Sequence, residues 1–294
     1  MKTDTGQTRS KKRRSQAAEI WHRLRKNKGA MVGLAIIAAL AFIALTADLW
    51  IDYEEQVITQ HISERLQWPS TSHFMGTDEY GRDIFFRLLY GARFSLSVGF
   101  VAVAIALGIG TTMGAIAGYY GGIVENLIMR FTDIFASVPN ILMGIVIVSA
   151  LGANTFNLML AVGITSVPQF VRITRASVLT VRNQEYVESA RAMGVSEFKI
   201  IFTHVLPNCL SPIIVQTTLR IASAIISASS LSFLGLGVPA PSPEWGSMLS
   251  SGRNFLRGYG YMTLFPGLAI MITVLAFNMV GDGLRDALDP KLKK

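Results

Sequence analysis

The sequence predicts an all-α polytopic membrane protein with six transmembrane helices, from its composition, its apolar runs and its basic ends. Of the 294 residues, 51% are hydrophobic and 16% are charged, which is typical of membrane proteins rather than soluble domains. Runs of about 20 apolar residues are long enough to cross roughly 30 Å of hydrocarbon. Six such runs occur, at about 29–49, 94–118, 127–150, 155–179, 208–236 and 262–281.

Basic residues predict how these runs are oriented. Residues 1–28 hold ten lysines and arginines against two acidic residues, and basic residues in short flanking segments resist translocation. Six crossings return the C-terminus to the cytoplasm, where 291–294 adds three lysines. Segment 51–93 then lies outside, and it has seven acidic residues, four arginines and no lysine. The basic run at 11–14 is therefore interpreted as a topology signal rather than a nucleic-acid-binding patch.

The runs divide the chain into five segments. Residues 1–28 are a cytoplasmic basic tail, in which Ile20, Trp21 and Leu24 beside basic side chains predict an amphipathic helix on the membrane surface. The first run is too long for a signal peptide and no small-residue cleavage site follows it, so a permanent anchor is expected. The other segments are this transmembrane anchor (29–50), an extracytoplasmic loop and elbow (51–93), a transmembrane core (94–285) and a cytoplasmic tail (286–294).

Several kinds of chemistry have no residues to perform them. Cys209 is the only cysteine, which excludes an intrachain disulfide and a thiolate metal cluster. The four histidines lack the spacing of a metal-binding helix, and there is no phosphate-binding loop for ATP. No nucleophile elbow or paired acid and base is visible. The chain is therefore expected to move or hold something, with energy from an ion gradient or from another chain.

A polar loop at 182–206 separates the fourth and fifth runs. A short helix is expected there from Glu185 to Met193, with Glu185 and Glu188 on one face. The other face is apolar and consists of Tyr186, Ala190 and Met193. Nothing in this chain obviously covers that face, so the helix suits a groove on a partner. The alternative is an ordinary interfacial loop whose apolar side chains lie among the lipid headgroups.

Three residues punctuate this loop. Gly194 can adopt the left-handed conformation that ends a helix. Ser196 can cap the helix that follows. Pro207 falls at the start of the fifth crossing, in the first turn that tolerates proline.

The stretch "ESARAMGVSEFKIIFTHVLP" resembles the cytoplasmic signature of ABC importer permeases. Five residues match the signature by position, while Ser189 replaces an alanine and His204 an isoleucine; the matches are Glu188, Ala190, Gly194, Leu206 and Pro207. The resemblance implies a coupling helix that fits a cleft in an ATP-hydrolysing subunit. The coupling residues it implies are Glu185, Tyr186, Glu188, Ser189, Ala190, Met193, Gly194, Ser196 and Pro207.

Motifs at 75–93, 230–249 and 281–293 look like the second permease subunit of dipeptide and oligopeptide ABC importers. The resemblance implies a type I importer permease fold, with the permease domain at 94–285, in a bacterial cytoplasmic membrane. It implies a non-catalytic subunit without a cofactor of its own, because ATP and Mg are bound by partner subunits. The implied partners are a second homologous permease, two ATP-binding subunits and an extracytoplasmic substrate-binding protein.

The resemblance leaves the cargo open. Di- or oligopeptides are expected, and nickel or metallophore complexes and glutathione are alternatives within the same family. A secondary transporter is a more distant alternative, but it would show inverted repeats and intramembrane acids. A membrane-embedded enzyme would need convergent catalytic groups, and none is visible.

Arg220 lies about 13 residues into the fifth run, or roughly 20 Å along a helix. A charge there costs a few kcal/mol unless it faces water or a partner. Gln216, Ser223 and Ser227 share its helical face. This stripe predicts a substrate path in which Arg220 meets a peptide carboxylate; the alternative is an ion pair with an acid of the partner subunit.

Other features are expected to be structural. The stripe of Gly110, Gly114 and Gly118 predicts close helix packing. Arg130 and Asp133 are placed to pair on one helix, and Pro139 predicts a kink. Two outer groups carry a choice between receiving a binding protein and shaping a loop: residues 78–83, with the structural role favoured, and Glu244 with Trp245, where the tryptophan also suits a membrane-interface anchor.

Overall fold

The computed structural model describes residues 16–288, and every regular element in that range is a helix apart from one isolated bridge between Thr77 and Asp83. The basic run at 11–14 and the lysines at 291–294 lie outside the described residues. The long helices are α1 (Gln16–Lys26), α2 (Lys28–Trp50), α3 (Ile84–Tyr120), α4 (Gly122–Ser137), α5 (Asn140–Leu151), α6 (Thr155–Val181), α7 (Glu185–Ala192), α9 (Leu210–Phe233), α10 (Trp245–Gly252) and α11 (Tyr261–Leu288). Short helical turns are η1 (Tyr53–Ile58), η2 (Ile62–Glu64), α8 (Glu197–Ile200), η3 (Ile201–Val205), η4 (Leu206–Cys209) and η5 (Arg253–Phe255).

Five helical segments are long and apolar enough to cross a membrane, which confirms the all-α membrane fold. They are α2, α3, α6, the stretch Glu197–Phe233 that ends in α9, and α11. The third expected span differs, because α4 and α5 meet at an angle of 90° and count as a sixth span only if taken together. Pro139 lacks the N–H that would continue the ladder, and Val138 before it is extended, as residues before proline prefer. The predicted kink at Pro139 is confirmed, and it divides the expected run over 127–150 into two helices.

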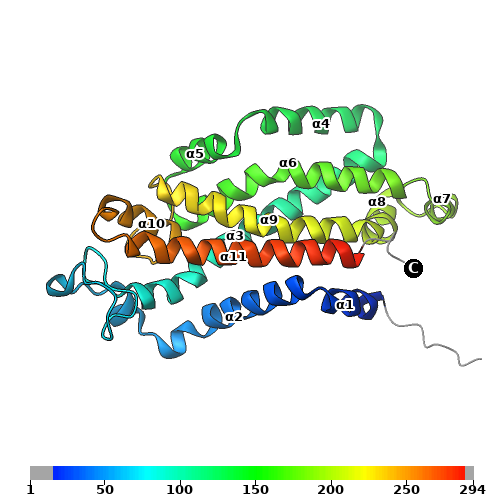
Figure 1. Cartoon of the computed structure of the whole chain (residues 1–294). Helices are drawn as coiled ribbons and strands as arrows, with labels where there is room; N and C mark the ends of the chain where they lie inside the picture. Colours follow the sequence, from blue (N-terminus) through cyan, green and yellow to red (C-terminus); the bar gives the residue numbers. More distant parts are fainter. Residues whose placement is uncertain (1–15, 289–294) are drawn as a thin grey trace, which may run out of the picture.

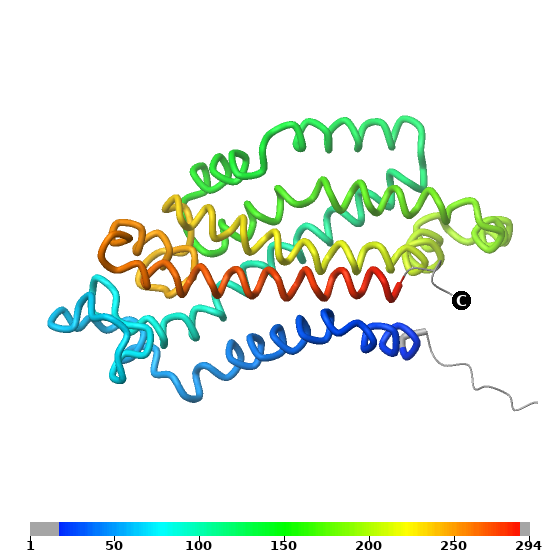
Figure 2. Tube along the Cα trace, in the orientation of Figure 1, coloured from blue at the N-terminus to red at the C-terminus, as the bar shows by residue number. Residues whose placement is uncertain are grey.

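The long helices lie side by side along the length of one bundle (Figure 1). One end of the bundle carries α1, α7, α8 and the last turn of α11, and we call it the coupling end, after the coupling helix that the sequence predicts there. The opposite end carries segment 51–83 and α10, and we call it the outer cap, after the side on which the sequence predicts segment 51–93 to lie. The tube in Figure 2 shows α4 and α5 along one side of the bundle, with α2 along another. Loops that are far apart in sequence are therefore sorted onto two opposite ends, as six crossings require.

The glycine stripe on α3 is where α6 packs closely. A Cβ added at Gly110 would lie 2.5 Å from the Cβ of Phe170, and one at Gly114 would lie 2.5 Å from the carbonyl oxygen of Val171. One at Gly118 would also meet α6 at 2.9 Å. Small residues let transmembrane backbones approach and gain van der Waals contact, so the packing prediction is confirmed.

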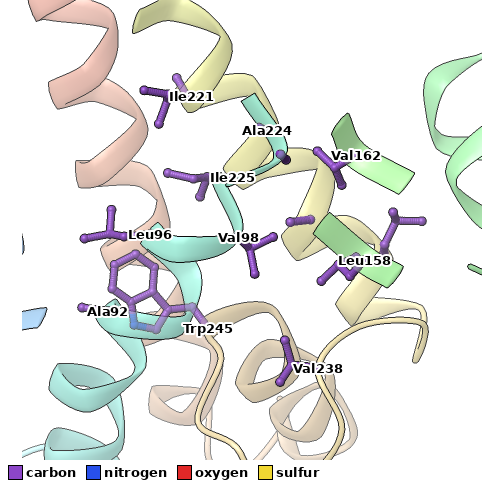
Figure 3. Packing of buried hydrophobic residues seen from close by; sticks show 14 of the residues in the cluster. Ala92, Leu96, Val98, Leu158, Val162, Ile221, Ala224, Ile225, Val238 and Trp245 are labelled. Carbon is purple, nitrogen blue, oxygen red and sulfur yellow. The ribbon is translucent and has the colours of Figure 1, made fainter. Parts of the chain in front are cut away.

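The main core lies where α3, α6 and α9 meet the outer cap (Figure 3). Val98, Leu158 and Ile225 are each at most 1% exposed, and the indole of Trp245 lies beneath them beside Ala92. The Trp245 Nε1 donates a hydrogen bond of 2.9 Å to the carbonyl oxygen of Leu88. Trp245 is therefore a core residue, and its interpretation as a membrane-interface anchor was wrong.

Buried charges organise the outer cap. Asp78 accepts hydrogen bonds from the backbone of Tyr80 and Arg82 and pairs with the Arg82 side chain at 2.7 Å. The Nη1 of Arg87, which is 5% exposed, donates to the carbonyl oxygen of Val57 at 2.7 Å. Asp83 caps the start of α3. These contacts confirm the structural interpretation of residues 78–83.

Two further acidic side chains, Glu244 and Asp133, have hydrogen-bond or ion-pair partners that account for their positions. Glu244 is 1% exposed and accepts from the backbone N–H groups of Gly246 and Ser247, both at 2.9 Å, which caps α10. Asp133 pairs with Arg172 of α6 at 2.9 Å. The predicted pair of Asp133 with Arg130 was therefore wrong, because the neighbouring helix supplies the cation.

Candidate functional site

The loop between α6 and α9 folds as the sequence predicts, into a short helix that a glycine ends. Helix α7 spans Glu185–Ala192, one residue shorter than expected, and Met193 follows as its C-cap. Gly194 has a φ of +76°, which confirms the left-handed conformation. The N–H of Val195 reaches back to the carbonyl oxygen of Ala190 at 3.2 Å and closes the turn. The direction of the chain after α7 is thus set by a left-handed backbone conformation that favours glycine.

The apolar face of α7 is divided between this chain and the solvent. Val187 and Ala190 are 0% and 2% exposed, in a cluster with Ile200 and other residues of α8 and η3. Tyr186 and Met193 are 42% and 76% exposed. The expectation that the chain covers none of this face was wrong, because Ala190 faces inward. An exposed apolar surface nevertheless remains on the helix.

Two neighbouring phenylalanines extend this exposed surface. Phe198 is 72% exposed and Phe202 is 40% exposed, and their rings lie 4.6 Å apart. We call Tyr186, Met193, Phe198 and Phe202 the coupling patch. Glu185 and Glu188 are also exposed, so acidic side chains border it. Large exposed apolar groups bordered by charge are typical of protein interaction surfaces.

The other predicted loop residues have local roles. The Ser189 hydroxyl donates to the carbonyl oxygen of Glu185 at 2.8 Å. Ser196 precedes α8 but makes no side-chain cap hydrogen bond, so the capping prediction was wrong. Pro207 lies in the first turn of η4, as predicted, within a helical stretch from Glu197 to Phe233 that changes to the turns η3 and η4 before α9 begins.

A polar triad, absent from the predicted site, joins α7 to the end of α3. The Nη2 of Arg191 donates to the hydroxyl of Tyr119 at 2.9 Å, and that hydroxyl donates to a carboxylate oxygen of Glu197. Arg191 and Glu197 also face each other at 3.4 Å. The hydrogen bonding to Tyr119 raises the pKa of Arg191. No local pattern in the sequence predicts this contact, because Tyr119 lies far from the loop along the chain.

The predicted path residues lie on α9 with partial burial. Gln216, Arg220, Ser223 and Ser227 are all neither fully exposed nor fully buried. The Nε of Arg220 is buried without a hydrogen-bond partner in the described part of the chain. No acid of residues 16–288 pairs with Arg220. The pairing alternative thus requires a residue outside this range or on another subunit.

A cleft of about 710 Å³ opens where the coupling ends of α6, η4, α9 and α11 meet. Gln216 lies in its wall, and Arg285 lines it from the last turn of α11. Hydroxyl and amide groups from three of these elements also line it. One predicted path residue therefore borders a real cavity, while the other three lie on α9 beyond its residues.

The side chains of the described residues also bear on whether the chain could hold a metal ion. Within the described range, no group of three or more His, Cys, Asp or Glu could hold a metal ion. Cys209 is 1% exposed.

Comparisons with known proteins agree with these features. Residues 110–294 match the family described as binding-protein-dependent transport system inner membrane component, and residues 15–69 match the N-terminal TM domain of oligopeptide transport permease C. The dipeptide transport system permease protein DppC of Alkalihalophilus pseudofirmus is 50% identical over 94% of this chain and 90% of its own length. The glutathione transport system permease protein GsiD of Pectobacterium atrosepticum is 44% identical over 97% of this chain and 94% of its own length.

A solved structure shares the fold. It shows inward facing conformations of the MetNI methionine ABC transporter, and it matches with a TM-score of 0.56 at 19% identity. The match covers 70% of this chain and 98% of that one.

Proposed function

The chain belongs to the family of binding-protein-dependent transport system inner membrane components, and from this premise we propose that it imports di- or oligopeptides. It is a non-catalytic, multi-pass permease subunit of an ABC importer in the inner membrane. The peptide cargo is supported by the relatives named for dipeptide and glutathione transport. Glutathione is itself a small peptide, so these relatives share a cargo chemistry; a nickel complex is the competing cargo.

The remaining subunits follow from the same premise. A second homologous permease encloses the path with this chain, and two ATP-binding subunits dock from the cytoplasm. An extracytoplasmic substrate-binding protein delivers the peptide to the outer cap. Both termini and the coupling end lie in the cytoplasm. This orientation is supported by the ten basic residues of 1–28, because cytoplasmic segments next to membrane spans carry an excess of lysine and arginine.

The observation that carries the mechanism is the half-covered helix α7. Its inner face packs on this chain through Val187 and Ala190, while Tyr186 and Met193 are left exposed. A helix held on one side and bare on the other suits a groove of an ATPase subunit. Closure of the ATPases then moves α7, and the attached bundle alternates between outward and inward access.

The polar stripe of α9 supplies the proposed substrate path. Arg220 offers a charge to a peptide carboxylate during transit, and Gln216, Ser223 and Ser227 offer hydrogen bonds on the same face. This role is supported by the buried, unpartnered Nε of Arg220, because an intramembrane charge requires a wet cavity or a partner.

ATPase activity of the purified complex in lipid, with its binding protein, tests cargo and coupling together. The complex is titrated with dipeptides, oligopeptides, glutathione and nickel chelates. Peptides are expected to stimulate ATP hydrolysis, and Gly194→Pro is expected to abolish stimulation because proline cannot adopt its φ of +76°. Arg220→Ala is expected to weaken the response to peptides.

Gly152→Pro is the matched control. Gly152 also has a positive φ, +91°, and open space around it, but it lies in the α5–α6 turn. Stimulation by nickel chelates alone would overturn the cargo. Unaltered stimulation in Gly194→Pro, or an equal loss in Gly152→Pro, would overturn the role of α7.

A further inference from the structure

The cleft at the coupling end has the size of a small-molecule site. Its volume is about 710 Å³, within the range of roughly 300–1,000 Å³ that ligand pockets occupy. Its walls come from the end of α6, from η4 and the first turns of α9, and from the last turn of α11. Figure 1 shows these parts together at the end that carries α7.

The polar side chains of this cleft differ in whether their hydrogen-bond donors already have a partner. The Ser177 and Thr180 hydroxyls donate to carbonyl oxygens of α6 itself, at 2.8 and 2.7 Å. Ser211, Gln216 and Arg285 make no side-chain hydrogen bond to any described residue, and each lines the cleft from α9 or α11. No group of residues 16–288 occupies their donors, so within the described chain a ligand can take them up.

Within residues 16–288, the charge that lines the cleft has one sign. Arg285 is the charged lining residue in that range, and none of the described lining residues is acidic. Asp282 and Asp286 lie on the same helix, but neither forms an ion pair with Arg285 in the described range. A guanidinium with free donors recognises carboxylates through paired hydrogen bonds.

We propose that this cleft is a release site in which Arg285 binds the C-terminal carboxylate of an imported peptide. The proposal rests on the proposed function and deepens it. A peptide that leaves Arg220 travels along α9 past Gln216, whose amide lines the cleft, and its carboxylate next meets Arg285. Because Arg285 is exposed to solvent, the ion pair is weakened by water, which suits a site that must let its ligand go.

Binding of alanyl-alanine and its C-terminal amide to the nucleotide-free complex tests the site. The measurement uses the full complex in lipid nanodiscs without the binding protein. An exposed charge-assisted pair predicts about a fivefold preference for the free carboxylate. Arg285→Gln is expected to lower this preference, and Arg285→Lys to restore part of it.

Arg25→Gln is the matched control, since Arg25 is an exposed arginine of α1 at the same end but does not line the cleft. A second readout is thiol labelling of Ser211→Cys in a Cys209→Ser background. Alanyl-alanine is expected to slow labelling there and to leave labelling of Ala18→Cys, on α1, unchanged.

Three results would overturn the inference: no preference in the wild type, an unchanged preference in Arg285→Gln, or an equal loss in Arg25→Gln. The proposed function fails separately, when the intact transporter imports no peptide. A complex that imports peptides but keeps its preference without Arg285 retains the function and loses the release site.

Discussion

Replacing Tyr119 with phenylalanine tests whether the triad carries motion from α7 to α3. The change removes one hydroxyl that bonds to both Arg191 and Glu197 while keeping a ring that is 6% exposed. Hydrogen bonds to charged groups contribute about 1.5–3 kcal/mol when buried. Here the Arg191 and Glu197 side chains are 51% and 44% exposed, so water replaces much of the loss and about 1 kcal/mol remains.

A loss of about 1 kcal/mol lowers the ratio of attached to detached α7 by about fivefold. The expected result is fewer peptides imported per ATP, with basal ATP hydrolysis retained because the coupling patch is untouched. The assay measures peptide uptake and phosphate release in the same proteoliposomes. Tyr120→Phe is the control, since Tyr120 is 53% exposed and its hydroxyl bonds to no described residue. An unchanged uptake-to-ATP ratio in Tyr119→Phe, or an equal fall in Tyr120→Phe, would refute the reasoning.

Three further predictions concern stability. Gly114→Ala should destabilise the chain by about 1–3 kcal/mol, because its Cβ would lie 2.5 Å from the Val171 carbonyl oxygen; denaturant unfolding in detergent measures this. Trp245→Ala should cost about 3–5 kcal/mol, since the 1% exposed indole fills the core and loses its bond to Leu88, which the same assay detects. Burial raises the pKa of Glu79 in the folded chain. Its ionisation therefore opposes folding once the pH rises above the ordinary pKa of a glutamate. Glu79→Gln should therefore raise the melting temperature at pH 8 more than at pH 4.5.

The spans could be predicted because the bilayer demands apolar length and little else. Five of the six expected runs correspond to helical segments that can cross a membrane. The ends of these runs match the ends of the helices less well where a helix contains a buried charged side chain. The second apolar run begins near 94, because Arg87 and Arg93 interrupt the apolar pattern, whereas helix α3 includes the elbow and begins at Ile84. Arg87 is nevertheless buried and donates to two backbone carbonyl oxygens. A search for apolar runs does not detect such a buried charge.

Local conformation was also predictable, while partners across helices were not. The turn at Gly194 and the bend at Pro139 depend on the residue itself. The partner of Asp133 depends on which helix packs beside α4, and Arg172 of α6 takes the place expected for Arg130. Sequence spacing reveals pairs within one helix and is silent about the neighbour.

The exposed residues of the candidate site could be predicted from the sequence, but its contacts with the rest of the chain could not. Tyr186 and Met193 are exposed as a docking helix requires, whereas the burial of Ala190 and the triad with Tyr119 arise from tertiary packing. The cleft has the same origin, since its walls come from α6, η4, α9 and α11. Gln216 could be found because it lies on a polar helical stripe; Arg285, at the end of a different helix, shares no pattern with it.

Helix α3 is the element through which movement of α7 can reach the outer cap. It is a single helix from Ile84 to Tyr120. Its coupling end holds the Tyr119 hydroxyl that bonds to α7, and its outer end holds the Arg87 side chain that donates to the carbonyl oxygens of Val57 and Pro241. Between them the glycine stripe presses α3 against α6, so the two helices cannot shift independently without losing backbone contact. A displacement of α7 is therefore expected to tilt α3 and α6 together and to shift the outer cap as one piece.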